Sequence, residues 1–156
     1  MKKYLFLLEN TFIVTLLRPY HGNSRKELTK MPKIFYNDVG LRNIVRGAIH
    51  IPQQDEGALF ENFVFSELKK RFIPNESLFF WRTTNGSEVD FVIRREGKIF
   101  PVEVKSLTLR RPAVSRSLSS FIASFQPETA VVVNRNFSHC EKINGTRVAF
   151  LPAYAL

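Results

Sequence analysis

The sequence predicts an α/β protein in which helices cover the faces of a mixed β-sheet. Three observations predict this class. A strongly apolar helical segment at 58–72 precedes three strand-like segments at 78–105, and an amphipathic helical segment at 114–125 precedes a continuous apolar run at 129–133. With a last strand expected at 148–151, this order of helices and strands favours a mixed sheet packed on both sides.

The segment before this core is predicted to be a short helical extension. Residues 4–17 carry apolar side chains at helical spacing, and Arg18-Pro19 is expected to end that helix. A basic polar stretch then leads to a strand-like run at 34–36. Glycine, proline and polar residues gather in 47–57, as is typical of a connector. We therefore predict an N-terminal extension over 1–46, a connector over 47–57 and the main domain over 58–156.

Two glutamates of the helical segment 58–72 fall within its apolar arc. At about 100° per residue, Glu61 and Glu67 both point toward the side that packs on the core. A buried lone carboxylate is costly, so each of them needs a partner. Glu67 can pair with Arg71 one turn later, whereas the equivalent position for Glu61 is occupied by Phe65. Glu61 is therefore the more interesting candidate.

The three strands at 78–83, 88–94 and 98–105 are predicted to form a meander. Turn signals separate them, namely Thr84-Asn85-Gly86 and Arg95-Glu96-Gly97. Strict alternation along the second and third strands gives each of them two sides. One side carries Val89, Phe91, Ile93, Phe100, Val102 and Val104, and the other carries Glu88, Asp90, Val92, Arg94, Glu103 and Lys105.

Asp90, Glu103 and Lys105 form the constellation with the clearest chemistry. Asp90 and Glu103 are thirteen residues apart, which fits neighbouring strands of a hairpin with both carboxylates on one face. Two acids this close repel each other unless a cation lies between them, so we expect a hard divalent ion, Mg²⁺ or Mn²⁺. The Val104 carbonyl and Glu61 are further candidate ligands. Lys105 could orient an attacking water or stabilise charge on a phosphoryl oxygen. The alternative is a solvated ion pair between Glu103 and Lys105.

The charge of the chain favours phosphate-rich partners. Its 156 residues include 23 Lys and Arg against 14 Asp and Glu, a formal charge of +9, and the excess runs through the whole sequence. Hydrophobic residues make up 44%, which excludes a disordered or fibrous chain. Candidate contacts to a nucleic-acid backbone are Trp81, Arg82, Arg94, Arg95, Arg110 and Arg111, although solvated arginines would give the same pattern.

Cysteine and histidine usage excludes other site types. The single cysteine, Cys140, excludes an internal disulfide framework and a cysteine-based zinc site, and the three histidines are far apart in sequence. The apolar stretch after Lys3 is interrupted at Glu9, and no small-residue cleavage site follows, so we expect no signal peptide. No stretch approaches the length of a membrane span. We therefore expect a cytoplasmic protein without a membrane partner.

These motifs, taken in order, resemble the PD-(D/E)xK nuclease superfamily, with EVD on the second strand and EVK on the third. The resemblance implies a restriction-endonuclease-like core, nucleic acid (DNA above all) as substrate, and Asp90, Glu103 and Lys105 as the active site, with Glu61 as the helix carboxylate. More closely, the chain resembles an uncharacterised C-terminal domain of bacterial and archaeal AAA-type ATPases. The matching stretches are YLFLLEN (4–10), RPY (18–20), KELTKMPKIFYNDVGLRN (26–43), GALFENFVFSELKKR (57–71), FFWRTTNGSEVDFVI (79–93) and PVEVK (101–105).

Two departures from that pattern matter. Val89 replaces the proline of the motif, and no G-x-x-x-x-G-K-[ST] phosphate loop occurs, so we expect no bound nucleotide. The resemblance places the first residues at the end of a winged-helix segment, which indicates a truncated chain, a split gene or a remnant. The ATPase region would then act in cis or in trans. Three hypotheses follow: a metal-dependent nuclease or Holliday-junction resolvase, a non-catalytic module that binds nucleic acid or a partner, and a homodimerisation domain.

Overall fold

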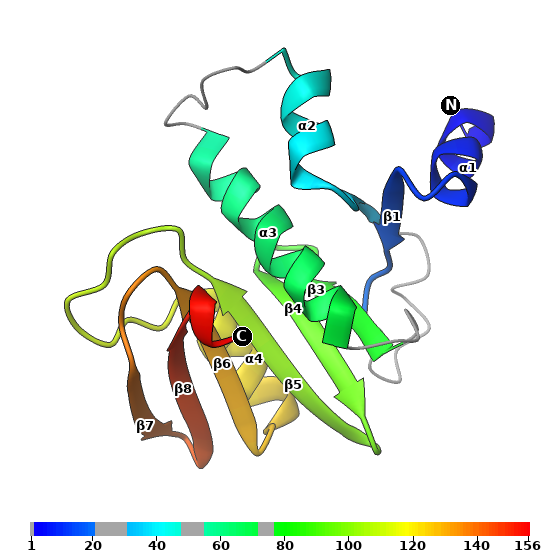
Figure 1. Cartoon of the computed structure of the whole chain (residues 1–156). Helices are drawn as coiled ribbons and strands as arrows, with labels where there is room; N and C mark the ends of the chain where they lie inside the picture. The colour runs from blue at the N-terminus through cyan, green and yellow to red at the C-terminus, as the bar shows by residue number, and fades with distance from the viewer. Residues whose placement is uncertain (1, 21–30, 48–54, 72–76) are drawn as a thin grey trace.

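A six-stranded mixed sheet with helices on both faces forms the centre of the computed structural model, which describes residues 2–20, 31–47, 55–71 and 77–156 (Figure 1). The strand order is β3-β4-β5-β6-β8-β7. The first three strands are antiparallel, β5, β6 and β8 are parallel, and β7 is antiparallel to β8. The predicted mixed sheet flanked by helices is confirmed. The strands are β3 (Leu78–Arg82), β4 (Glu88–Arg95), β5 (Lys98–Val104), β6 (Thr129–Asn134), β7 (His139–Ile143) and β8 (Thr146–Pro152).

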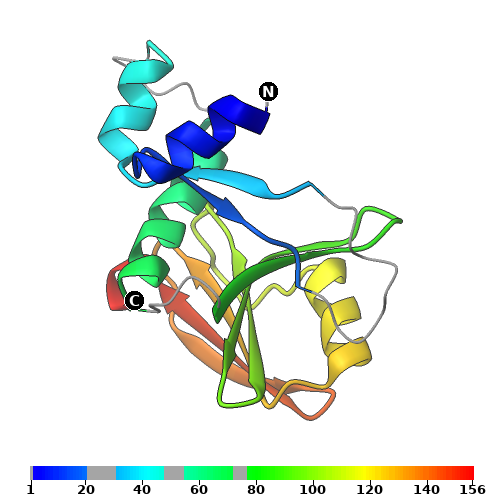
Figure 2. The same ribbon diagram turned by 90° about the vertical axis from the view of Figure 1, so that its right-hand side faces the viewer.

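One helix covers each face of this sheet (Figure 2). Helix α3 (Glu56–Arg71) packs Val64, Phe65 and Leu68 against one face, in a cluster that includes Phe91 and Val102. Helix α4 (Arg116–Phe125) packs against the other face through Leu118, Phe121 and Ile122, in a cluster that includes Val92, Val132 and Phe150. The two apolar cores explain why β6 is a continuous apolar run, because its alternate side chains enter different cores.

Two hairpins close on two-residue turns. Glu96 and Gly97 join β4 to β5 with φ of 52° and 75°, as a type I′ turn requires. Asn144 and Gly145 join β7 to β8 in the same way, with φ of 48° and 88°. Strand β7 was not predicted, because it lies at the sheet edge with mostly exposed side chains and lacks an apolar pattern. The Asn-Gly turn was the available signal.

The N-terminal region differs from the prediction. Helix α1 (Lys2–Asn10) ends where Thr11 bonds back to the Leu7 carbonyl, and Phe12 takes φ of 58°. The predicted helix over 4–17 is therefore wrong in its second half, where the β-branched residues after Phe12 favour a strand. Strand β1 (Val14–Leu17) pairs with β2 (Lys33–Tyr36) in a separate two-stranded sheet.

A short helix and the start of α3 lie where other structure was predicted. Helix α2 (Val39–Val45) was missed, although Asp38 caps it by accepting a hydrogen bond from the Leu41 amide at 2.7 Å. Residues 48–54 of the predicted connector lie outside the described residues, and α3 begins at Glu56 within it. In the described part of the chain, no helix is long and apolar enough to cross a membrane.

Candidate active site

A β-bulge in β4 changes the direction in which the Asp90 side chain points. Phe79 pairs with Val92 and Trp81 pairs with Val89, so Asp90 and Phe91 together lie opposite a single residue of β3. Val89 and Val92 accordingly enter the α4 core, while Phe91 enters the α3 core. The predicted strict alternation along β4 is therefore wrong at this point. The extra residue turns Asp90 toward the α3 side, and bulges commonly re-aim side chains next to functional sites.

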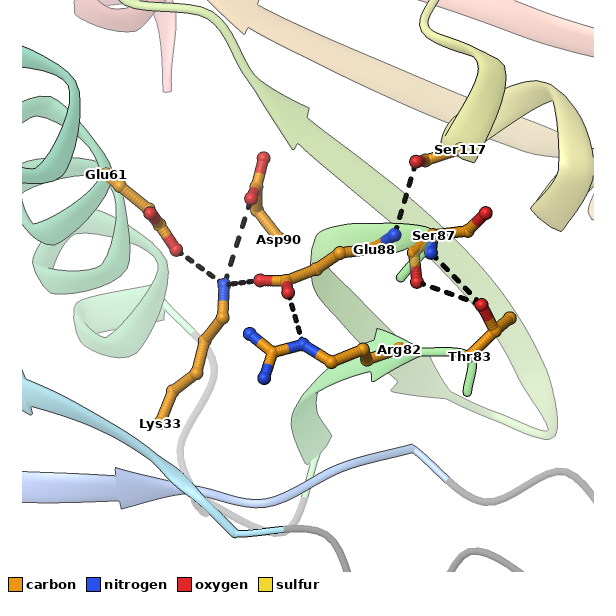
Figure 3. Close-up of polar contacts among 8 residues, drawn as sticks. All are labelled: Lys33, Glu61, Arg82, Thr83, Ser87, Glu88, Asp90 and Ser117. Carbon is orange, nitrogen blue, oxygen red and sulfur yellow. Dashed lines mark hydrogen bonds and ion pairs between the residues drawn. The ribbon is translucent and has the colours of Figure 1, made fainter. Parts of the chain in front are cut away.

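Lys33 lies among three carboxylates on this side of the sheet (Figure 3). Its Nζ lies 2.8 Å from Glu61 Oε1, forms an ion pair with Glu88, and lies 3.8 Å from Asp90 Oδ1. Burial lowers the pKa of Lys33, but attraction to Glu61, then to Glu88 and Asp90, outweighs burial and raises it. The lysine of β2 is therefore the cation that balances acids of α3 and β4.

Glu88, like Lys33, belongs to this group but was not among the predicted site residues. Arg82, from β3, also pairs with it, so two cations share one carboxylate. Burial raises the pKa of Glu88, yet the hydrogen bonds from Arg82 and Lys33 outweigh burial and lower it. Ionised Glu88 therefore binds both cations, and one of them, Lys33, lies 3.8 Å from Asp90 Oδ1. We call Lys33, Glu61, Glu88 and Asp90 the Lys33 cluster.

The surroundings of Asp90 disfavour its charged form, in contrast to those of Glu88. Its Oδ2 accepts a hydrogen bond from the Val104 amide at 2.8 Å. Burial, the negative charge of Glu61 and the negative charge of Glu103 outweigh that bond and the attraction of Lys33, and they raise the pKa of Asp90 to about 7. A strongly perturbed carboxyl among further acids is a common property of catalytic and binding sites.

Glu103 is held from the opposite face of β5. Its neighbours Val102 and Val104 pack in the α3 core, and Glu103 points toward the start of α4. Lys105 Nζ lies 3.0 Å from its Oε1, and Ser115 Oγ donates to its Oε2 at 2.9 Å. The same Ser115 oxygen accepts from the Leu118 amide and so caps α4. Glu103 is thus fixed in orientation and only 8% exposed.

The Lys33 cluster and Glu103 with its two partners lie near each other where the backbone pairing of β4 with β5 ends. The last backbone pair before the opening is Phe91 with Val102, and the Asp90 carboxylate bonds the Val104 amide beyond it. The structure therefore brings Asp90, Glu103, Lys105 and Glu61 into one region, with Glu103 influencing the pKa of Asp90. Val104, whose amide binds Asp90, directly follows Glu103 in the chain.

The metal hypothesis can be tested against this donor set. Within the described ranges, no three Asp, Glu, His or Cys side chains are arranged as ligands of one ion. The available donors are carboxylate oxygens and a main-chain carbonyl, the ligands that Mg²⁺ and Mn²⁺ prefer. An ammonium group already stands among three of the carboxylates. The donor types suit a hard cation, but Lys33 Nζ lies at Glu61, Glu88 and Asp90. Glu103 is bound by Lys105 and Ser115 instead.

The candidate nucleic-acid contacts are dispersed. Trp81 is only 4% exposed and packs edge-on against Phe121 and Phe125, so its ring belongs to the core and offers no stacking surface. Arg82 belongs to the site through Glu88. Exposed Arg110 and Arg111 lie between β5 and α4. Arg94, over the Phe79 ring, and Arg95, beside Glu96, lie at the far end of β4.

The sequence reasoning missed three residues of the site. Lys33 had no local signal, because its partners are 28 or more residues away in sequence. Glu88 was visible on the same side of its strand as Asp90, and Ser115 was visible as a candidate helix cap. The expected Glu67–Arg71 pair does not form, because Glu67 pairs with Lys70 and Arg71 donates to the Leu156 carbonyl.

Comparison with known proteins identifies related domains. The family model of a domain of unknown function, DUF4143, matches residues 56–154, which contain the whole six-stranded sheet. A second domain of unknown function, DUF8612, matches residues 1–50. Uncharacterized proteins of Mycobacterium bovis and Mycobacterium tuberculosis are each 29% identical over 136 residues. The match covers 85% of this chain and 30% of each relative, so the chain spans less than a third of their length.

Proposed function

The chain belongs to the DUF4143 family, and from the geometry of its site we propose that this domain hydrolyses phosphodiesters with the help of a divalent metal ion. The observation that carries the proposal is the meeting of Asp90, Glu103 and Lys105 where the β4–β5 ladder opens. The resemblance of the EVD and EVK segments to PD-(D/E)xK nucleases supports a restriction-endonuclease-like core and DNA as the substrate.

Asp90, Glu103 and the Val104 carbonyl would hold Mg²⁺ or Mn²⁺, with Glu61 reaching the ion or its waters. Such an ion supplies Lewis-acid stabilisation of the charge that develops on the phosphoryl group. The Glu103 carboxylate is oriented in advance, because Lys105 holds one of its oxygens and Ser115 holds the other. Preoriented groups lower the barrier because they need not reorganise during the reaction.

Lys105 acts on the phosphate and the attacking water. Its ammonium is 3.0 Å from Glu103 and about a quarter of its side chain is exposed, so it is both positioned and accessible. From there it can stabilise charge on a phosphoryl oxygen or orient the water that attacks phosphorus. The attacking water forms a new P–O bond and loses a proton, and the bond to the leaving oxygen breaks as that oxygen takes up a proton.

The test is cleavage of duplex DNA, single-stranded DNA, a four-way junction and RNA with Mg²⁺ or Mn²⁺. Wild type is compared with Glu103→Gln and Lys105→Met, and each variant should cleave at least about 100-fold more slowly. The matched controls are Glu128→Gln and Lys98→Met, which break an exposed ion pair of the same type. Controls that lose activity to the same extent, or site variants that keep it, would reject the proposal.

A non-catalytic module that binds nucleic acid or a partner is the second candidate. It is favoured by Lys33, which already neutralises part of the acidic group. Under this alternative the purified wild type cleaves no substrate with either metal and binds neither metal, and it still binds oligonucleotides. Metal-dependent turnover that depends on Glu103 would exclude this alternative.

A larger partner region is also proposed. The chain spans 30% of the length of its mycobacterial relatives, and α1 exposes the apolar side chains of Tyr4, Phe6 and Leu7. Exposed apolar side chains on one helix are typical of an interaction surface. We propose an AAA-type ATPase region, in cis or in trans, as the partner that covers them. Replacing Phe6 with Ser should weaken co-purification with that region without changing the fold of the sheet domain.

A further inference from the structure

A cavity beside the Lys33 cluster is rich in cationic side chains. It has a volume of about 470 Å³ and lies between β2, α2, the first half of α3 and the edge of the site. Its charged lining consists of Lys33, Arg42, Arg46 and Arg82 with Glu61 and Glu88. The cations outnumber the acids, and both acids are already engaged with Lys33. Lys33 also lies near Asp90, and Arg46 pairs with Asp55, so the cation of this lining without an acidic partner among the described residues is Arg42. An anion entering the cavity would be attracted to that charge.

Arg42 is the unusual member of this lining. The residue is 6% exposed, and its guanidinium donates to the neutral Asn43 side chain at 3.2 Å. Among the described residues no carboxylate lies within ion-pair distance of it. A guanidinium withdrawn from water needs compensation, which an anionic ligand would supply. Arg46 follows one turn later and pairs with Asp55 at 2.8 Å, at the exposed mouth of the cavity.

Hydrogen bonds hold in place the side of the cavity that carries Arg42 and Arg46. The Asn62 side chain accepts from the Tyr36 amide at 3.0 Å and donates to the Tyr36 carbonyl at 2.8 Å. This pair of bonds attaches β2 to α3, and the Asp38 cap begins α2 immediately after β2. Arg42 and Arg46 are therefore presented from a short helix whose start is anchored beside the site.

We propose that this cavity binds a backbone phosphate of a nucleic-acid strand, with Arg42 and Arg46 as the binding side chains, next to the phosphate that is cleaved. The choice of ligand rests on the proposed function. Guanidinium groups suit phosphate because they donate two parallel hydrogen bonds and remain charged. Lys33, Glu61 and Glu88 line the cavity, and Lys33 Nζ lies 3.8 Å from Asp90 Oδ1. A strand that occupies the cavity would therefore continue past the Lys33 cluster toward Asp90.

The experiment measures binding of fluorescent single-stranded and duplex DNA and of RNA by anisotropy, in EDTA and over a range of salt concentrations. Arg46→Gln should weaken binding about fivefold and reduce the salt dependence by about one phosphate contact. Arg42→Gln should weaken binding at least as much. If Arg42→Gln does not fold, because Arg42 is buried, the binding of Arg46→Gln alone tests the proposal. The control, Lys142→Gln with Arg147→Gln, removes more charge on the exposed β7–β8 hairpin and should change affinity less than twofold.

The outcomes separate this inference from the proposed function. Equal losses in the control and in Arg46→Gln, no loss in Arg46→Gln, or no binding by wild type would overturn the phosphate site, even if the protein cleaves DNA with metal. Losses confined to Arg42→Gln and Arg46→Gln would support the site, even if no metal-dependent cleavage is found and the non-catalytic function is the correct one.

Discussion

Asn134 and Asp90 are polar residues at the same end of the central sheet, and their surroundings differ sharply. Asn134 ends β6 and is fully buried. Its side chain accepts from the amides of Asn136 and Phe137 and donates to the carbonyls of Phe137 and Leu151. Asp90 accepts one amide hydrogen bond, while a cation lies 3.8 Å away.

The difference separates a structural role from the binding role that we propose for Asp90. The side chain of Asn134 satisfies the backbone of the turn that follows β6, so it stabilises the fold. The charge of Asp90 is opposed by burial and by Glu61 and Glu103, so ionised Asp90 costs stability in the metal-free protein. A group kept in an unfavourable electrostatic state is relieved when a cation binds it. Three changes sharpen this contrast.

The largest effect is expected from Asn134→Ala. It leaves the amides of Asn136 and Phe137 and the Leu151 carbonyl without their partner, and it should lower the free energy of unfolding by about 3 kcal/mol. Denaturant unfolding measures it. Asn85→Ala, at an exposed turn position, is the control and should cost under about 0.5 kcal/mol. Equal effects of the two variants would remove the structural role of Asn134.

Asp90→Asn should increase stability, by about 2 kcal/mol at pH 8 in EDTA. The pKa of Asp90 is raised from 3.8 to about 7 by burial and then by Glu61, so the protonated form is favoured in the folded state. Its stabilising contribution is complete below pH 3.8 and is lost as the pH rises through 7.

Melting temperatures at pH 5 and pH 8 measure this effect. Wild type should lose more stability than Asp90→Asn between these values. Glu128→Gln, which removes an exposed carboxylate, should follow the wild-type profile. If Asp90→Asn and wild type show the same pH dependence, Asp90 is not electrostatically destabilised and the comparison with Asn134 fails.

Lys33→Met should strengthen Mn²⁺ binding about tenfold. The ammonium of Lys33 lies among Glu61, Glu88 and Asp90, so its removal leaves more negative charge for a divalent ion. Isothermal titration calorimetry measures the affinity. Lys98→Met removes one positive charge elsewhere and should leave the affinity within twofold of wild type. Weaker binding by Lys33→Met would mean that Lys33 supports the metal site instead of competing with it.

Much of the fold was accessible from the sequence, because α3, α4 and β3 to β6 have strong local patterns of apolar residues and turns. The proximity of Asp90 and Glu103 followed from hairpin spacing. The predicted placement of both carboxylates on one sheet face is wrong, because Asp90 turns toward α3 and Glu103 toward α4. The bulge at Asp90 could not be predicted, because register depends on how β3 packs against β4. Lys33 could not be predicted either, because it reaches the site from a separate two-stranded sheet.

The most direct test of the central claim is the rate of Mg²⁺-dependent cleavage by Asp90→Asn, measured on the preferred substrate of wild type at saturating concentration. The substitution retains an oxygen that can accept the Val104 hydrogen bond and removes the charge. We predict a loss of at least about 100-fold in a variant that is more stable than wild type. Cleavage at the wild-type rate would contradict the assignment of Asp90 to the active site.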